Sequence, residues 1–199
     1  MIDLLQWLGG AFYLLNKIFL SLSEHAYNHD DRIRARQWRI VSWLVYLIGL
    51  SPWVILFILK HNWIAASVEA SGAPAMLLGL VLAWRGSTNK PPSFLNYLAI
   101  ICIPLGFIYS LYDFGGLNTL NQWLEIGLVL GFLVGTYQLA KERASGYLWY
   151  ILMHLCCAYL MWVQDYPWLS VQQVVSLVFI VDAYQVTQKR KNIIKTDYN

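Results

Sequence analysis

Polar and ionisable residues interrupt several otherwise apolar segments of this chain, and these residues could bind a ligand. They are Lys17, Glu69, Glu125, His154, Gln172, Gln173 and Asp182. A charged group at membrane depth costs about 3 kcal/mol unless it is paired or hydrated, so each is a candidate functional residue. Carboxylates and amides hydrogen-bond hydroxylated ligands, and the aromatic residues Trp53, Trp149 and Tyr150 offer faces for a flat ring. No covalent chemistry is needed for such binding.

Each candidate also has a purely structural explanation. Glu69 and Glu125 lie within about two turns of the ends of their segments, from which a side chain can reach interfacial water. Lys17 could neutralise a carboxylate in a buried ion pair, with Glu69 or Asp182 as the partner. His154 could be a hydrogen-bonded contact between helices.

The composition requires an apolar environment around these residues. Of the 199 residues, 58% are hydrophobic and 13% are charged, with a mean hydropathy of +0.48. Soluble domains are about 45–50% apolar. Many of the Trp and Tyr residues fall at the edges of the apolar stretches, as in an interfacial belt. The sequence therefore predicts an all-α integral membrane protein with the lipid bilayer as its surroundings, and it does not indicate nucleic-acid binding.

Motifs for metals, cofactors and intramembrane proteolysis do not occur in the sequence. Cys102, Cys156 and Cys157 lie inside apolar segments without metal-ligand or disulfide spacing. Haem would need a second axial ligand at the depth of His154, whereas the other histidines fall in predicted loops. Neither a Gly-x-Ser-x-Gly nor a His-Glu-x-x-His element occurs. We expect no metal, no cofactor and no enzyme activity.

Apolar stretches of about 17–23 residues, each long enough to cross the hydrocarbon layer, predict seven transmembrane helices. The predicted spans are Leu4–Leu22, Val41–Leu59, Ile64–Trp84, Phe94–Tyr112, Trp123–Leu139, Tyr147–Val163 and Leu169–Val186.

Lys and Arg favour the cytoplasmic side of a membrane protein, and this bias predicts the orientation of the chain. With the N-terminus outside and the C-terminus inside, that side receives Arg32, Arg34, Arg36, Arg39, Arg85, Lys90, Lys141, Arg143, Lys189, Arg190, Lys191 and Lys195. The outside receives Lys60, so one topology accounts for nearly every basic residue.

An internal repeat divides the chain into two similar halves. Gln6-Trp7-Leu8 at the start of the first span recurs as Gln122-Trp123-Leu124 at the start of the fifth, and Trp63…Ser67-Val68-Glu69 resembles Trp168…Ser170-Val171-Gln172. We expect a single transmembrane domain (1–199) with a parallel 3+1+3 plan: bundles 1–86 and 120–191 joined by linker helix 93–113. Transporters with such repeats bind substrate between them, which favours Glu69 and Gln172 as ligand-binding residues.

Motifs in both halves resemble one transporter family. Tyr150…His154, Tyr166-Pro167-Trp168-Leu169-Ser170-Val171-Gln172-Gln173 and Asp182-Ala183 follow one another in the second half, and Trp63…Glu69…Gly79…Trp84 in the first. Order and spacing resemble the PnuC-type vitamin (nicotinamide riboside) transporters, within the SWEET and PQ-loop-like transporters. The Trp-x-x-x-Asn signature of that family reads Tyr150-Ile151-Leu152-Met153-His154 here, and Gly49 replaces the matching Asn of the first half.

This resemblance implies a multi-pass protein of a bacterial inner membrane that moves a small vitamin- or nucleoside-like metabolite by alternating access, through facilitated diffusion. The substrate path would contain Trp53, Glu69, Trp149, Tyr150, His154, Gln172, Gln173 and Asp182. A homo-oligomer is compatible with the sequence. The alternative is a structural or signalling membrane subunit, whose polar residues would face outward to a partner. A transporter instead requires Glu69, His154, Gln172 and Asp182 to converge on one cavity.

Overall fold

The computed structural model describes residues 2–86, 91–113 and 119–196, and every regular element within these ranges is an α-helix. The helices are α1 (Ile2–Asn28), α2 (Arg32–Leu59), α3 (Trp63–Ser71), α4 (Ala73–Arg85), α5 (Ser93–Asp113), α6 (Leu120–Ala140), α7 (Ser145–Val163) and α8 (Pro167–Thr196). Each predicted span falls within one helix, or within α3 and α4 taken together. Lys90 lies outside the described residues.

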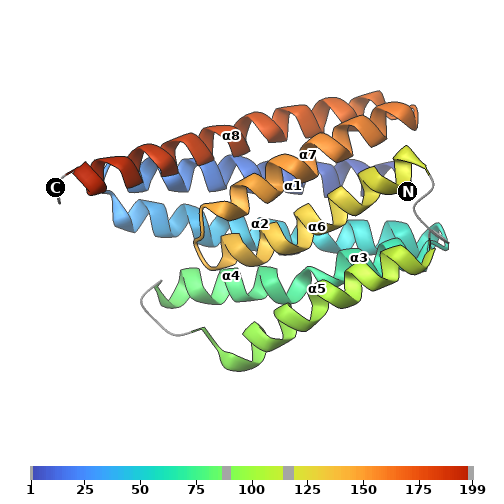
Figure 1. Ribbon diagram of the computed structural model, residues 1–199, viewed down its shortest axis with the longest axis horizontal. Coiled ribbons are helices and arrows are strands. Elements are labelled where there is room, and N and C mark those ends of the chain that lie inside the picture. The colour runs from blue at the N-terminus through green and yellow to red at the C-terminus, as the bar shows by residue number, and fades with distance from the viewer. Residues whose placement is uncertain (1, 87–90, 114–118, 197–199) are drawn as a thin grey trace.

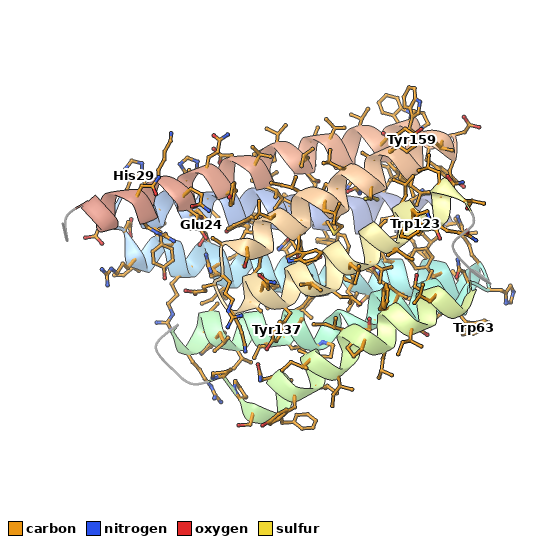
Figure 2. All side chains as sticks on the ribbon, in the orientation of Figure 1. Glu24, His29, Trp63, Trp123, Tyr137 and Tyr159 are labelled. Atoms are coloured by element: carbon orange, nitrogen blue, oxygen red, sulfur yellow. The ribbon has the colours of Figure 1, made fainter. Side chains whose placement is uncertain are left out.

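Figure 1 shows the helices running along the long axis of the molecule, with the two termini near opposite ends. The α1–α2 and α6–α7 connections and the C-terminus lie at one end, which we call the basic end. Basic residues gather there: Arg32, Arg34, Arg36, Lys141, Arg143, Lys189 and Arg190. The N-terminus and the α2–α3 and α7–α8 connections lie at the other, which we call the aromatic end. The exposed Trp7, Trp63, Trp123, Trp162 and Trp168 lie there, and Figure 2 labels two of them.

Five helical stretches are long and apolar enough to cross a membrane: 32–59, 65–85, 120–140, 145–163 and 167–190, with a shorter apolar helix at 93–108. These support an all-α, multi-pass membrane protein. Helix α1 is not among the five although it has 27 residues, and it buries Asn16, Lys17, Ser21, Ser23 and Glu24. It therefore brings a row of polar side chains into the interior of the bundle.

The helices extend further than the hydropathy pattern predicts, mainly at the basic end. Helix α1 continues to Asn28 and α2 begins at Arg32, where the Asp31 carboxylate caps it by accepting from the Arg34 amide at 3.0 Å. Hydropathy ends a span at the first charges, whereas Arg and Lys are good helix formers in water. The predicted spans therefore marked the apolar cores of longer helices.

Helices α3 and α4 form one rod with a break at Gly72. The Gly72 amide donates to the Glu69 carbonyl at 3.1 Å, and Pro74 lies in the first turn of α4, where a missing amide hydrogen costs little. A Cβ at Gly72 would lie 2.5 Å from Cζ of Phe132, so α6 approaches the break closely. The break ends α3 two residues after Glu69.

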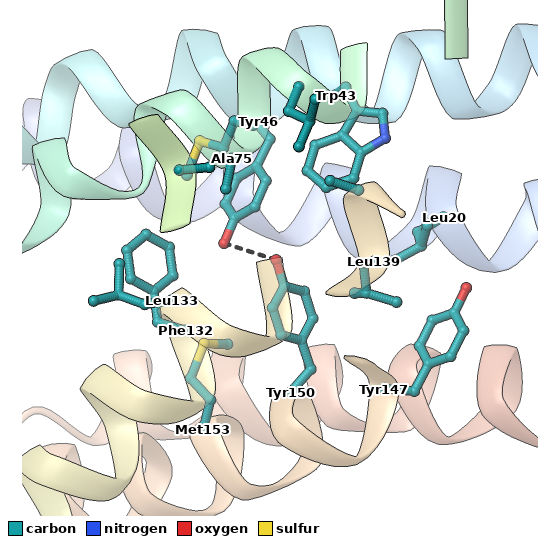
Figure 3. Close-up of a cluster of buried hydrophobic side chains, with 14 of the residues drawn as sticks. Leu20, Trp43, Tyr46, Ala75, Phe132, Leu133, Leu139, Tyr147, Tyr150 and Met153 are labelled. Carbon is teal, nitrogen blue, oxygen red and sulfur yellow. Dashed lines mark hydrogen bonds between the residues drawn. The ribbon is translucent and has the colours of Figure 1, made fainter. Parts of the chain in front are cut away.

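The helix contacts close into a ring. Helix α1 packs against α2 and α8, α2 against the α3–α4 rod, α4 against α6, α6 against α7, and α7 against α8. Helix α5 packs outside this ring against α3, α4 and α6. Figure 3 shows buried side chains meeting inside the ring, where Tyr46 of α2 and Tyr150 of α7 are joined by a hydrogen bond of 3.1 Å.

Candidate functional site

A cavity of about 310 Å³ lies inside the ring and reaches the aromatic end. Exposed Lys60, Asn62, Gln164 and Tyr166 line it at that end, and Lys17 lines its deep part. Its walls come from α1, α2, α3, α6, α7 and α8, so every rod of the ring contributes. Ligand pockets commonly measure about 300–1,000 Å³, so the cavity has room for a small metabolite.

The side chains of Trp53 and Gln172, which line the cavity, approach the backbone of α1 closely. The rings of Trp53 and Phe57 stack with centroids 5.8 Å apart. A Cβ at Gly9 would lie 2.8 Å from Nε1 of Trp53, and one at Gly10 would lie 3.0 Å from Oε1 of Gln172. The two glycines therefore let side chains of α2 and α8 reach the backbone of α1, where Nε2 of Gln172 donates to the Gly10 carbonyl at 2.8 Å.

Glu69 brings a carboxylate to the cavity from α3. Asn62 caps this helix by accepting from the Ala65 amide at 2.9 Å, and the break at Gly72 ends it. The Tyr13 hydroxyl of α1 donates a hydrogen bond to Glu69. A carboxylate beside a helix break matches the discontinuous helices that carry substrate sites in many transporters.

Lys17 forms the floor of the cavity and is 1% exposed. Its ammonium donates to Oδ1 of Asn16 at 2.8 Å and lies 4.2 Å and 4.1 Å from the ring centroids of Tyr46 and Tyr150. Asn16 is held in turn by Ser42. Two aromatic faces and an amide thus stabilise the cation. Neither predicted ion pair of Lys17 is among the salt bridges of the described residues.

His154 lines the cavity beside this floor and is 2% exposed. Its Nδ1 donates to Oε1 of Gln173 at 2.7 Å, while its Nε2 is buried without a hydrogen-bond partner. The ring meets the Tyr150 ring edge-on at 6.2 Å. The predicted residues Trp53, Glu69, His154, Gln172 and Gln173 therefore line one cavity together with Lys17.

Other predicted residues lie elsewhere. Trp149 packs against α6, where its carbonyl would lie 2.6 Å from a Cβ at Gly131. Tyr150 is buried behind the floor, where it contacts the cavity-lining residues Lys17, Tyr46 and His154. Asp182 lies toward the basic end, where it accepts from Ser21 at 2.5 Å and from Nε2 of His25 at 2.9 Å. None of the three is among the residues that line the cavity.

Sequence reasoning missed several residues that line the cavity, among them Gln6, Tyr13 and Tyr46. Gln6, Tyr13 and Lys17 recur on one face of α1, and Tyr46 and Trp53 are seven residues apart on α2. A spacing of three to four or seven residues places side chains on the same helix face. The period around Lys17 could therefore have identified Tyr13 and Gln6, and Ser42 and Arg39, four and seven residues before Tyr46, could have marked that residue.

A second polar site, which we call the ion-pair cluster, closes the basic end. The Glu24 carboxylate, 3% exposed, contacts Arg39 at 2.5 Å and Arg190 at 3.2 Å, and it accepts from the Tyr147 hydroxyl at 2.7 Å. Arg39 also contacts Glu142 at 3.4 Å. The cluster borders a small cavity of about 140 Å³ and joins α1 and α2 to α7 and α8.

Together these sites define a multi-pass helical membrane protein with a ligand-sized cavity at one end and an ion-paired closure at the other. Comparison of the chain with protein-family models, with curated proteins and with solved structures finds no match. The PnuC resemblance therefore depends on the motifs of this sequence. In the described part of the chain, no group of three or more His, Cys, Asp and Glu side chains could hold a metal ion.

Proposed function

We propose that this chain is a membrane transporter for a small vitamin- or nucleoside-like metabolite that works by alternating access, through facilitated diffusion. The observation that carries the proposal is the single cavity into which Glu69, His154 and Gln172 converge from three different helices. Buried polar groups around an otherwise aromatic pocket are typical of small-molecule sites. PnuC-type transporters, whose motifs the sequence resembles, suggest the class of substrate.

The proposed topology has seven spans in a parallel 3+1+3 arrangement, with the N-terminus outside, in a bacterial inner membrane. The helix ring supports it, because exchanging α1, α2 and α3–α4 with α6, α7 and α8 leaves every neighbour relation of the ring unchanged. Helix α5 lies outside the ring, as a linker helix would. Glu69 and Gln172 occupy matching places in the two halves and both line the cavity.

With this topology the cavity opens outward and the ion-pair cluster faces the cytoplasm. Alternating access then requires the cluster to separate when the cavity closes at the aromatic end. The cluster joins the two proposed bundles, since Glu24 and Arg39 belong to one and Tyr147 and Arg190 to the other. We propose that the structure represents an outward-facing state.

The alternative function, a structural or signalling subunit, would place the polar residues on the outer surface of the bundle. Glu69, His154 and Gln172 line the interior cavity instead, and this favours transport. Asp182, the fourth residue expected in the cavity, instead contacts α1 at the basic end, so it does not support the expected convergence.

Uptake of labelled vitamins and nucleosides into proteoliposomes tests the proposal. We expect at least one compound to cross, and Glu69→Ala and His154→Ala to lower its uptake about tenfold or more. Gln185→Ala serves as the control, because Gln185 is exposed on α8 away from the cavity. If no compound crosses, the transporter proposal is wrong. If both variants transport normally, the cavity is not the substrate path.

A further inference from the structure

Several hydrogen-bond donors deep in the cavity already have partners inside the protein, whereas Nε1 of Trp53 is buried without one. The Lys17 ammonium has Asn16 and two aromatic faces, and the Tyr13 hydroxyl donates to Glu69. Nε2 of Gln172 donates to the Gly10 carbonyl and Nδ1 of His154 to Gln173. Nε1 of Trp53 can donate to one ligand acceptor, and any further ligand acceptor would have to displace one of these contacts.

Two acceptors in the same cavity have no partner. Nε2 of His154 and Oε1 of Gln172 are both buried without a hydrogen bond. Because Nδ1 of His154 carries the hydrogen that Gln173 accepts, the neutral ring keeps its lone pair on Nε2. An unsatisfied buried acceptor costs about 1–3 kcal/mol, and such atoms are few in native proteins. The two acceptors therefore need an explanation that the protein itself does not supply.

We infer that the cavity recognises its ligand through hydrogen bonds that the ligand donates, with Nε2 of His154 and Oε1 of Gln172 as the accepting atoms. This inference rests on the transport function proposed above and adds the direction of the hydrogen bonds. The ligand then carries at least two O–H or N–H groups next to a flat ring. The ring stacks against the Trp53 and Phe57 pair, and a vicinal diol such as that of ribose supplies the two donors.

The charged residues that line the cavity, Glu69, Lys60 and Lys17, are compatible with a ligand that donates hydrogen bonds. The Glu69 carboxylate faces the same cavity and adds acceptor capacity beyond its bond from Tyr13. Lys60 lies at the exposed mouth, and the deeper Lys17 is enclosed by Tyr46 and Tyr150. A site built to accept from a ligand hydroxyl rejects analogues that lack it, because its own buried groups then stay unpaired.

Matched ligand pairs test the inference with the full chain in nanodiscs. Binding of adenosine, inosine and uridine is measured by calorimetry beside the 2′,3′-dideoxy analogue of each. At least one riboside is expected to bind about tenfold tighter than its dideoxy analogue, as the loss of two hydrogen bonds predicts. In His154→Phe and Gln172→Met this ratio falls toward one, because neither new side chain offers an oxygen or nitrogen acceptor to the riboside hydroxyls.

Gln185→Met is the control, because it makes the same chemical change on an exposed face of α8 and should keep the tenfold ratio. Since the measured quantity is a ratio within each variant, a general loss of stability does not imitate the expected result. If ribosides and dideoxy analogues bind equally, the two acceptors are merely hydrated and this inference is wrong, although transport can still stand. If no compound of the panel binds and none crosses, the inference and the transport proposal fail together.

Discussion

The cavity and the ion-pair cluster differ in the partners of their buried polar groups. In the cavity that opens at the aromatic end, Lys17 is held by an amide and two rings, and acceptors on His154 and Gln172 have no partner. At the basic end Glu24 and Arg39, both almost inaccessible to solvent, meet opposite charges in a cluster whose outer members Arg190 and Glu142 are partly exposed. The charges at the basic end are neutralised by one another. The acceptors in the cavity have no partner in the protein, so they can accept hydrogen bonds from a ligand. The difference indicates closure at one end and recognition at the other.

Removing one member of the ion-pair cluster should have the largest effect. Arg39→Leu leaves the Glu24 carboxylate buried with only Arg190 as a charged partner, and we expect the free energy of unfolding to fall by about 3 kcal/mol. Chemical unfolding in detergent micelles measures it. Arg34→Leu is the matched control, because Arg34 pairs with Asp31 at the exposed surface, where such pairs contribute little. Equal effects of the two substitutions would show that the cluster does not hold the basic end together.

Accessibility to a membrane-impermeant thiol reagent should differ between the two ends about tenfold or more. In a chain whose native cysteines are replaced, Gln164→Cys lies at the exposed mouth of the cavity and Thr187→Cys at the cluster, where Thr187 is 4% exposed. We expect rapid labelling of the first from outside the cell, since the proposed topology turns the aromatic end outward, and slow labelling of the second from either side. Combining Thr187→Cys with Arg39→Leu should open it from the cytoplasmic side.

Labelling of Gln164→Cys only from the cytoplasm would reverse the proposed orientation. Rapid labelling of Thr187→Cys in the otherwise native chain would contradict the closed basic end.

The smallest effect should come from Asp182, which lines neither the cavity nor the ion-pair cluster. Asp182→Asn weakens a half-exposed contact with His25 and should lower the free energy of unfolding by less than about 1 kcal/mol. Because Asp182 does not line the cavity, uptake of any transported compound should stay within about twofold of the native rate, which corresponds to well under about 1 kcal/mol. A loss of uptake comparable to that of Glu69→Ala would return Asp182 to the substrate path.

The sequence by itself predicted the helices, their apolar cores and the gathering of basic residues at one end. Each of these features depends on the hydropathy and charge of a short stretch of sequence, so it can be predicted without knowing which helices pack together. It also singled out Glu69, His154 and Gln172, because an isolated polar residue in an apolar span is conspicuous without any knowledge of its partners.

Only the tertiary structure decided which polar groups meet. Lys17 faces Tyr46 and Tyr150 rather than a carboxylate, Glu24 joins Arg39 and Arg190, and Asp182 faces α1 at the basic end. Each contact depends on the rotation of a helix about its axis and on its neighbours in the ring. Linear spacing gives the residues that share a face, but the packing of all the helices together decides what that face touches.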